Sequence, residues 1–210
     1  FFLIDQKEKF DLEIIISDDG STDNTRKILK ENQHLYDKLV ENEKNLGKGA
    51  AIRSGLKVIT GEIILFQDAD LEYDPSDYEK LIKPFTDQDA DVVYGSRFLG
   101  SSAHRLIYYS HRIANFLITN LVNIFTNINF SDVETGYKVI RKAILDDLEL
   151  QENSFGIEIE VTMKISKKNA RIYEVGISYN GRTYAEGKKI TFKDALIAVA
   201  LVFKYFFLKK

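Results

Sequence analysis

The chain has 210 residues, of which 44% are hydrophobic, and a formal net charge of −3 at pH 7. A chain of this length and composition can bury one good core, and its acidic balance leads us to expect no nucleic-acid partner. The absence of cysteine excludes disulfides, thiol catalysis and cysteine-based zinc sites, and three scattered histidines argue against a histidine-rich metal site.

Apolar runs alternate with helix-like segments along most of the chain. The strand-like runs are residues 12–17, 62–67, 91–95, 137–141 and 171–177. The helix-like segments are residues 24–35, 48–58, 76–85, 105–126 and 157–168. Alternation of this kind predicts an α/β fold in which helices flank a mostly parallel sheet.

Two helices carry start signals. Asp74 before Pro75 predicts an N-cap followed by proline at the first helical position. Thr191 with Asp194 three residues later predicts a capping box that opens a final helix. The apolar part of that helix, residues 195–208, is shorter than the roughly 20 residues that cross a bilayer. We expect it either to lie on a membrane surface or to be buried against the sheet.

Two acidic clusters each follow a strand-like run. Asp18 and Asp19 end the first run, and Asp68 and Asp70 follow the second. Ligands of open α/β sheets bind beyond the carboxyl ends of the strands, so we expect both clusters to project into one site. Carboxylate oxygens are the ligands that Mg²⁺ and Mn²⁺ prefer and share with phosphates. The clusters therefore predict a site for a metal-bound nucleotide.

The Asp-x-Asp spacing occurs three times among the 17 aspartates of the chain. Asp87, Asp89 and Asp91 form two of these spacings in a polar stretch that predicts a solvated loop. Only Asp68 and Asp70 follow a buried-strand run, which favours them over the others as the functional pair.

The charges are distributed unevenly. Residues 186–210 hold six lysines against two acids, and this basic tail predicts a surface for anionic lipid. No aspartate or glutamate occurs between Asp91 and Asp132, so something in this stretch disfavours negative charge. The arginines of the stretch are Arg97, Arg105 and Arg112.

Four motifs in chain order carry a family resemblance. They are DDGSTDNT at 18–25, NLGKGAAIRSG at 45–55, DADL at 68–71 and GSRF at 95–98. Together they resemble the family 2 glycosyltransferases of the GT-A fold. The later segments 110–115, 132–138 and 181–188 resemble the branch that makes dolichyl- or polyprenyl-phosphate sugars.

The resemblance implies transfer of a hexose from a nucleotide diphosphate sugar, of the UDP-glucose or GDP-mannose type, to a lipid phosphate with inversion at the anomeric carbon. It implies a GT-A domain over residues 1–190, followed by an amphipathic, membrane-associated helix over residues 191–210. We expect the first strand of the domain to be missing, because no Pro-x-Tyr-Asn-Glu-like segment precedes Asp18. The implied location is peripheral, on the cytoplasmic face of a membrane.

The resemblance also implies roles for single residues. Asp70 would bind Mg²⁺ or Mn²⁺ with Glu72, and Asp68 would hold the donor sugar or ribose. The other donor-binding positions are Asp18, Asp19, Ser21, Gly47, Lys48 and Arg53. The positions for the acceptor phosphate are Arg97, Arg112, Arg182 and Lys188. The residues implied to be catalytic are Asp68, Asp70, Arg112 and Arg182.

Each of these residues also has a purely structural explanation. Asp18 and Asp19 fit an Asx-type turn, the Gly-Lys-Gly segment fits a plain helix start, and a surface arginine fits a solvated charge. For Arg112 the functional explanation is favoured, because an unpaired charge inside the otherwise apolar helix 106–125 would be costly.

Two other functions fit part of the pattern. A family 2 glycosyltransferase with a hydroxyl acceptor, in cell-wall or polysaccharide synthesis, requires a general base, for which Asp132 and Glu134 are the candidates. A non-catalytic nucleotide-binding module would keep Asp18 and Asp19 but have no use for the arginines. A lipid phosphate is already anionic and requires arginine but no base. The sequence leaves the nucleotide, the hexose and the oligomeric state open.

Overall fold

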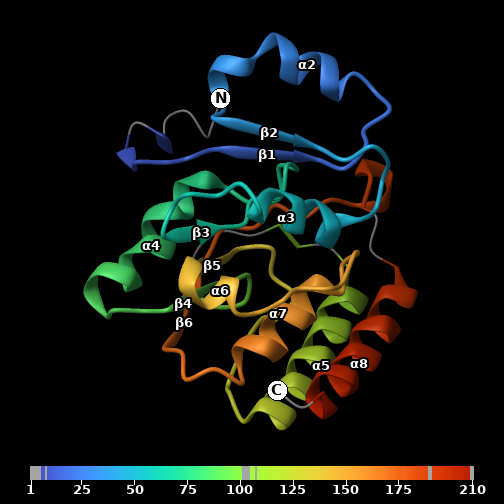
Figure 1. The fold of residues 1–210 in the computed structure, drawn as a ribbon. Helices are drawn as coiled ribbons and strands as arrows, with labels where there is room; N and C mark the ends of the chain where they lie inside the picture. Colours follow the sequence, from blue (N-terminus) through green and yellow to red (C-terminus); the bar gives the residue numbers. More distant parts are fainter. Residues whose placement is uncertain (1–5, 8, 101–104, 107, 189–190, 209–210) are drawn as a thin grey trace. The chain divides into compact units, whose positions relative to one another are not determined.

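The computed structural model describes residues 6–7, 9–100, 105–106, 108–188 and 191–208 (Figure 1). The chain forms two compact units, the first of residues 1–62 and 150–157 and the second of residues 63–149 and 158–210. The predicted boundary after residue 190 lies within the second unit. The strand predicted to be missing would precede residue 1 and lies outside the described residues.

The first unit contains a two-stranded parallel sheet of β1 (Ile15–Asp18) and β2 (Lys38–Glu41). Its helical elements are α2 (Thr25–Glu31), η1 (Gln33–Leu35) and α3 (Lys48–Leu56). The Ser17 hydroxyl donates to the Ala51 carbonyl at 2.6 Å, which fastens α3 to β1. The sequence analysis missed β2, because its four residues begin and end with a charge and form no apolar run.

The sheet of the second unit has four strands. Their spatial order is β3 (Ile63–Leu65), β5 (Lys138–Arg141), β4 (Val92–Ser96) and β6 (Ile172–Gly176) (Figure 1). β4 and β6 are parallel, whereas β5 is antiparallel to both β3 and β4. The α/β prediction is confirmed, but the sheet is mixed rather than mostly parallel. Residues 127–137 lead the chain back to the carboxyl ends of β3 and β4. The chain enters β5 from that edge, so β5 is antiparallel to both strands.

The helical elements of the second unit are η2 (Pro75–Asp77), α4 (Tyr78–Asp87), α5 (Tyr109–Thr126), α6 (Lys142–Asp146), α7 (Ile157–Ile165, whose first residue belongs to the first unit), η3 (Tyr184–Glu186) and α8 (Phe192–Phe207). Most of them fall in predicted segments, but α6 and η3 were not predicted, and α5 begins four residues after the predicted start at 105. Both predicted start signals are confirmed. The Asp74 carboxylate accepts from the Ser76 amide at 2.9 Å, and Thr191 and Asp194 form the capping box of α8.

The α8 helix packs beside α5 (Figure 1). The Phe125 ring of α5 lies with its centroid 5.2 Å from that of Phe203 and 4.5 Å from that of Phe206. Lys167, after α7, donates to the carbonyls of Tyr205 and Leu208 at 2.5 and 2.7 Å. In the part of the chain that the structure describes, no helix has both the length and the apolar character needed to cross a membrane.

Gly20, directly after β1, requires glycine for two reasons. Its φ is +73°, and a Cβ atom there would lie 2.5 Å from Asn45 N and 2.7 Å from Lys44 Cα. Gly187 also has a positive φ, of +91°, but a Cβ atom there would meet no described atom within 4 Å. The two positions therefore separate backbone strain from steric conflict.

We predict that Gly187→Ala lowers the free energy of unfolding by about 1 kcal/mol, the cost of a left-handed backbone alone. Gly20→Ala should lower it by about 3 kcal/mol or more, because the clash with residues 44–45 adds to the strain. Urea unfolding measured by circular dichroism tests both variants. Equal losses would contradict the close approach.

Candidate active site

The carboxylate of Asp18 at the end of β1 is buried and paired. Arg26 donates from Nε to its Oδ2 at 2.8 Å, and the Ser21 amide donates to the same atom at 3.2 Å. Burial would raise the pKa of Asp18, but the bonds from Ser21 and Arg26 outweigh it and hold the pKa below its usual value. The sequence analysis missed Arg26, since no motif marks its proximity to Asp18.

Asp19 closes the loop that precedes α3. Its carboxylate accepts from the amides of Leu46 and Gly47 at 3.0 and 2.6 Å and from the Asn42 side chain at 2.8 Å. These contacts give Asp19 a structural role within the first unit. Its predicted contact with a nucleotide stays a prediction.

The start of α3 lies against the segment 152–153 of the same unit. A Cβ atom on Gly47 would lie 2.5 Å from the Asn153 carbonyl oxygen. Arg53 donates to the Glu152 carbonyl and, at 2.5 Å, to Asn153 Oδ1. Packing therefore accounts for part of this motif, and the predicted donor-binding roles of Ser21, Gly47, Lys48 and Arg53 stay predictions.

In the second unit, the carboxylates of Asp70 and Glu72 converge on one cation. Arg182 Nη2 lies 2.5 Å from Asp70 Oδ2, and Arg182 Nε lies 3.1 Å from Glu72 Oε1. The Arg182 amide donates to the same Glu72 oxygen at 2.9 Å, and the Tyr179 hydroxyl donates to Glu72 Oε2 at 3.0 Å. Arg182 thus contacts the predicted metal ligands.

These two carboxylates have opposite pKa shifts. Burial raises the pKa of Asp70, and the charges of Asp68 and Glu72 add to this effect. For Glu72, burial is outweighed by the bonds from Arg182 and Tyr179, so its pKa lies below the usual value. Both groups offer the hard oxygen ligands that Mg²⁺ and Mn²⁺ prefer and already face a positive charge, so they fit a divalent cation.

A cation would need further ligands beside these two. The described residues contain no cluster of three or more histidine, aspartate or glutamate side chains that could hold a metal ion by itself. Asp68 lies at the other end of the motif, where a Cβ atom on Gly136 would lie 2.6 Å from its Oδ2. A metal here would therefore rest on Asp70, Glu72 and the oxygens of a bound ligand.

Tyrosines that the sequence analysis did not single out hold this region together. The Tyr73 ring lies with its centroid 4.7 Å from that of Tyr137 and 5.5 Å from that of Tyr179. Its hydroxyl accepts from the Gly136 amide at 2.8 Å, and burial raises its pKa to about 12. Tyr73 and Tyr179 also form an antiparallel backbone bridge, which places the segment 179–182 beside the Asp68–Asp70 motif.

A cavity of about 290 Å³ opens beside the N-terminal part of α5. Its walls combine cations with aromatic rings. The cations are Arg97, Arg105, Arg112 and Lys188, and the rings belong to Phe98, Tyr108, Tyr109, His111 and Tyr179. Three of the four predicted acceptor-phosphate residues thus line one cavity, whereas Arg182 is not among the lining residues.

Two of these cations have no carboxylate partner among the described residues. Arg112 is exposed and lies over the Phe98 ring, 5.8 Å from its centroid. Burial lowers the pKa of Lys188, and although the charge of Glu72 opposes this effect, the charges of Arg97 and Arg182 add to it. Arg105, in contrast, pairs with Glu186 at 2.8 Å. The cavity therefore holds two cations, Arg112 and Lys188, that have no direct ion-pair partner among the described residues.

Arg97 is held by Asp132, which is fully buried. The Asp132 carboxylate accepts from Arg97 Nε and Nη2, each at 2.7 Å, and from the Arg97 amide at 3.1 Å. It also accepts from Asn115 Nδ2 at 3.1 Å. With four donors on two oxygens, Asp132 orients Arg97 and is poorly suited to accept a proton from a substrate.

Glu134 has the opposite properties. Its Oε1 atom is buried and has no hydrogen-bond partner among the described residues. Burial raises its pKa to about 7, and the charge of Glu158 acts in the same direction. Of the two candidate bases, Glu134 is therefore the one whose carboxyl group can change protonation near neutral pH.

The other Asp-x-Asp spacings have structural partners. Asp91 pairs with Arg171 at 3.1 Å, and Asp89 pairs with Arg141 at 3.1 Å. These pairs tie the loop before β4 to Arg171, which precedes β6, and to Arg141, the last residue of β5. Their surroundings agree with the structural interpretation of this stretch.

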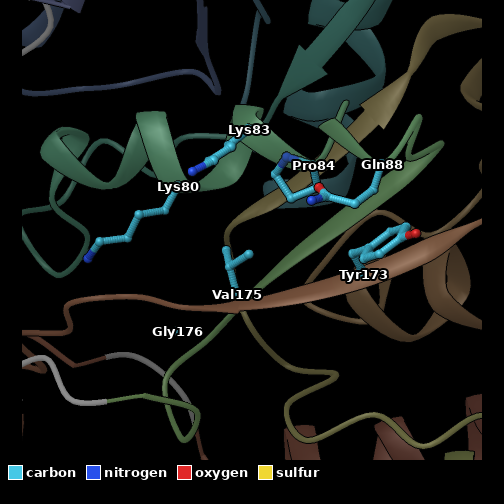
Figure 2. Close-up of a pocket in the computed structure, with 7 residues that line it drawn as sticks. All are labelled: Lys80, Lys83, Pro84, Gln88, Tyr173, Val175 and Gly176. Carbon is cyan, nitrogen blue, oxygen red and sulfur yellow. The ribbon is translucent and has the colours of Figure 1, made fainter. Parts of the chain in front are cut away.

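A second cavity, of about 530 Å³, lies between the end of α4 and β6 (Figure 2). Lys80, Lys83 and Pro84 of α4 lie across from Tyr173 and Val175 of β6. None of the predicted site residues lines this cavity, so it is separate from the chemistry considered above.

Residues 2–149 match the family described as glycosyl transferase family 2. The chain belongs to this family. The uncharacterized protein MJ0544 of Methanocaldococcus jannaschii is 31% identical over 96% of this chain and 91% of its own length. The dolichyl-phosphate beta-glucosyltransferase of Saccharomyces cerevisiae is 32% identical over 83% of this chain. The dolichol-phosphate mannosyltransferase of Pyrococcus furiosus is 26% identical over 84%.

The chain spans 59% of the yeast protein and 50% of the Pyrococcus protein. Both names agree with the branch of the family predicted from the motifs. Among solved structures, glucosyl-3-phosphoglycerate synthase of Mycobacterium tuberculosis in complex with Mn²⁺, UDP and phosphoglyceric acid matches with a TM-score of 0.73. The match covers 99% of this chain and 74% of the synthase chain, at 18% sequence identity, and it confirms the GT-A fold.

We predict that Glu134→Gln changes how stability depends on pH. A carboxyl group whose pKa is raised in the folded state stabilises the fold below its usual pKa and loses that contribution as the pH rises through about 7. Between pH 5 and pH 8, the free energy of unfolding of the variant should therefore rise relative to that of the wild type, by up to about 3 kcal/mol. Urea unfolding at both pH values measures the difference, and parallel profiles would show that Glu134 is not protonated in the fold.

Proposed function

We propose that the chain is an inverting, metal-dependent glycosyltransferase that moves a hexose from a nucleotide diphosphate sugar to a dolichyl or polyprenyl phosphate. The observation that carries this proposal is the cavity in which Arg112 and Lys188 have no direct ion-pair partner among the described residues. An acceptor that brings its own negative charge would complete it. The names of the yeast and Pyrococcus relatives support the same acceptor class.

The shape and lining of the cavity suit a phosphate on an apolar chain. The Arg112 guanidinium can bind two phosphate oxygens at once, and Lys188 adds a second charge. Phe98, Tyr108 and Tyr109 offer apolar surface beside them. Arg97, already held by Asp132, would supply a fixed positive field rather than a mobile contact.

On the donor side, Asp70 would be the main ligand of Mg²⁺ or Mn²⁺, with Glu72 beside it. The metal would neutralise the charge that develops on the leaving nucleotide. Arg182 is better assigned to this side than to the acceptor phosphate, because its guanidinium lies on Asp70 and Glu72. Donor contacts from Asp18, Asp19, Ser21, Gly47, Lys48, Arg53 and Asp68 remain part of the proposal.

A membrane surface would present such an acceptor, and α5 and α8 carry a face that suits it. On α5 the exposed apolar residues recur at helical spacing: Tyr109, Ile113, Phe116, Leu117 and Ile124. On α8 they are Leu196, Ile197, Phe203, Phe206 and Phe207. Adjacent exposed faces of this kind, with a basic tail, support peripheral binding to the cytoplasmic face of a membrane.

The second candidate is a hydroxyl acceptor, as in polysaccharide synthesis. One observation favours it: Glu134 has a free carboxyl oxygen and a pKa of about 7, as a general base requires. Asp132 no longer qualifies, since its oxygens are occupied. A non-catalytic nucleotide-binding module would not explain why Arg112 and Lys188 line the cavity without a direct ion-pair partner among the described residues.

The experiment that tests the proposal compares two acceptors. We expect radiolabelled sugar to pass from UDP-glucose or GDP-mannose, with Mn²⁺, to polyprenyl phosphate but not to the corresponding free alcohol. Extraction into organic solvent measures the product. Transfer to the alcohol alone would support the hydroxyl-acceptor candidate.

A second prediction concerns Arg112. Arg112→Lys keeps the charge but loses the planar fork, so the KM for polyprenyl phosphate should rise about tenfold, equivalent to about 1.4 kcal/mol, while the KM for the donor stays constant. Arg171→Lys is the matched control, because Arg171 pairs with Asp89 and Asp91 outside the site. A rise in the donor KM instead would place Arg112 on the diphosphate.

A further inference from the structure

The guanidinium of Arg182 contacts both carboxylates that are proposed to bind a divalent cation, Asp70 and Glu72. It contacts Asp70 Oδ2 at 2.5 Å and Glu72 Oε1 at 3.1 Å. These oxygens are the ones that the proposed metal requires. A metal ion and the Arg182 guanidinium at the same carboxylate oxygens would repel one another, so the presence of each weakens the binding of the other.

We propose that Arg182 is a resident counter-ion of the metal site, which a divalent cation displaces and which then pairs with the diphosphate of the donor. This inference rests on the proposed function, because it takes Asp70 as the metal ligand. It proposes that the metal and the Arg182 guanidinium compete for Asp70. The donor reduces this competition, because its diphosphate pairs with the displaced guanidinium.

The contacts of Arg182 allow its side chain to leave without unfolding the segment that carries it. The side chain is about one-third exposed, at 34%, whereas Glu72 is 12% exposed. The Arg182 amide and the Tyr179 hydroxyl bind Glu72 independently of the guanidinium, and the Asn180 amide donates to the Glu72 carbonyl at 2.9 Å. The backbone of 179–182 can therefore stay in place while the guanidinium turns away.

The same contacts make Asp70 the principal metal ligand. Both oxygens of Glu72 accept bonds from the segment 179–182 that the departure of the guanidinium does not break. Asp70 loses the Arg182 guanidinium and, among the described residues, keeps the Glu72 amide as its one hydrogen-bond donor, at 3.1 Å on Oδ1. Its Oδ2 is then available to the metal.

Displacement leaves a positive charge beside the metal and near Lys188, whose charge already acts on Glu72. That arrangement is unfavourable until an anion arrives. A nucleoside diphosphate supplies the anion and bridges both cations. Metal and nucleotide should therefore bind cooperatively, and by linkage each should raise the affinity of the other by the same factor.

The test measures Mn²⁺ binding by electron paramagnetic resonance of the free ion, without any acceptor. Without nucleotide, Arg182→Gln should bind Mn²⁺ about fivefold more tightly than the wild type or better, because the competing cation is gone. Saturating UDP should strengthen Mn²⁺ binding more in the wild type than in Arg182→Gln. Arg182→Lys, which keeps a charge without the fork, should lie between them.

Three controls keep the outcome decisive. Arg171→Gln removes an arginine from a different pair of aspartates and should leave Mn²⁺ binding unchanged. Thermal melting shows whether each variant is folded. If Arg182→Gln does not fold, Mn²⁺ binding by Arg182→Lys is compared with that of the wild type instead. Equal or weaker Mn²⁺ binding by the folded Arg182 variants overturns the inference.

The Asp70→Asn variant separates this inference from the proposed function. If Asp70→Asn loses Mn²⁺ binding while the Arg182 variants leave it unchanged, the metal site stands and only the competition is wrong. If Asp70→Asn binds Mn²⁺ as the wild type does, the metal assignment within the proposed function fails, and the competition fails with it.

Discussion

The buried carboxylate of Asp132 is the contact on which the cavity beside α5 depends. It joins the end of β4, through the amide and guanidinium of Arg97, to α5, through Asn115. Removing one partner from a buried ion pair typically costs about 3–5 kcal/mol, because the other charge is left without compensation. Arg97 also lines the cavity, so the same pair that stabilises the second unit fixes part of the cavity wall.

The reversed direction of β5 makes this contact available. Because the chain enters β5 from the carboxyl edge of β3 and β4, the residues before it cross that edge. Asp132 there meets Arg97, and Gly136 meets Tyr73 and lies beside Asp68. A parallel β5 would begin at the opposite edge of the sheet, far from both residues. The mixed sheet is therefore a requirement of the site rather than an incidental departure from a parallel one.

Charge is balanced differently at the two ends of the proposed reaction. Around Asp70 and Glu72 the protein supplies its own cation, Arg182, which balances part of the negative charge before any ligand binds. In the cavity beside α5, Arg112 and Lys188 have no direct ion-pair partner among the described residues. This difference favours an anionic acceptor and a metal-bound donor. Glu134, with its protonation near neutral pH, is the feature that a hydroxyl acceptor would use instead.

Most helices and strands, both helix caps and the family resemblance could be predicted from the sequence, because each depends on periodicity or on residues close together in the chain, whereas the short α6 and β2 were not predicted. Resemblance to family motifs also predicted that Arg97, Arg112 and Lys188 belong together, and all three line one cavity. Tertiary structure alone decided the direction of β5, the pairing of Asp18 with Arg26, and the place of Arg182 on Asp70 and Glu72. Those features depend on contacts between residues that are far apart in the sequence. Local sequence patterns do not show which of these residues come close together in the folded chain.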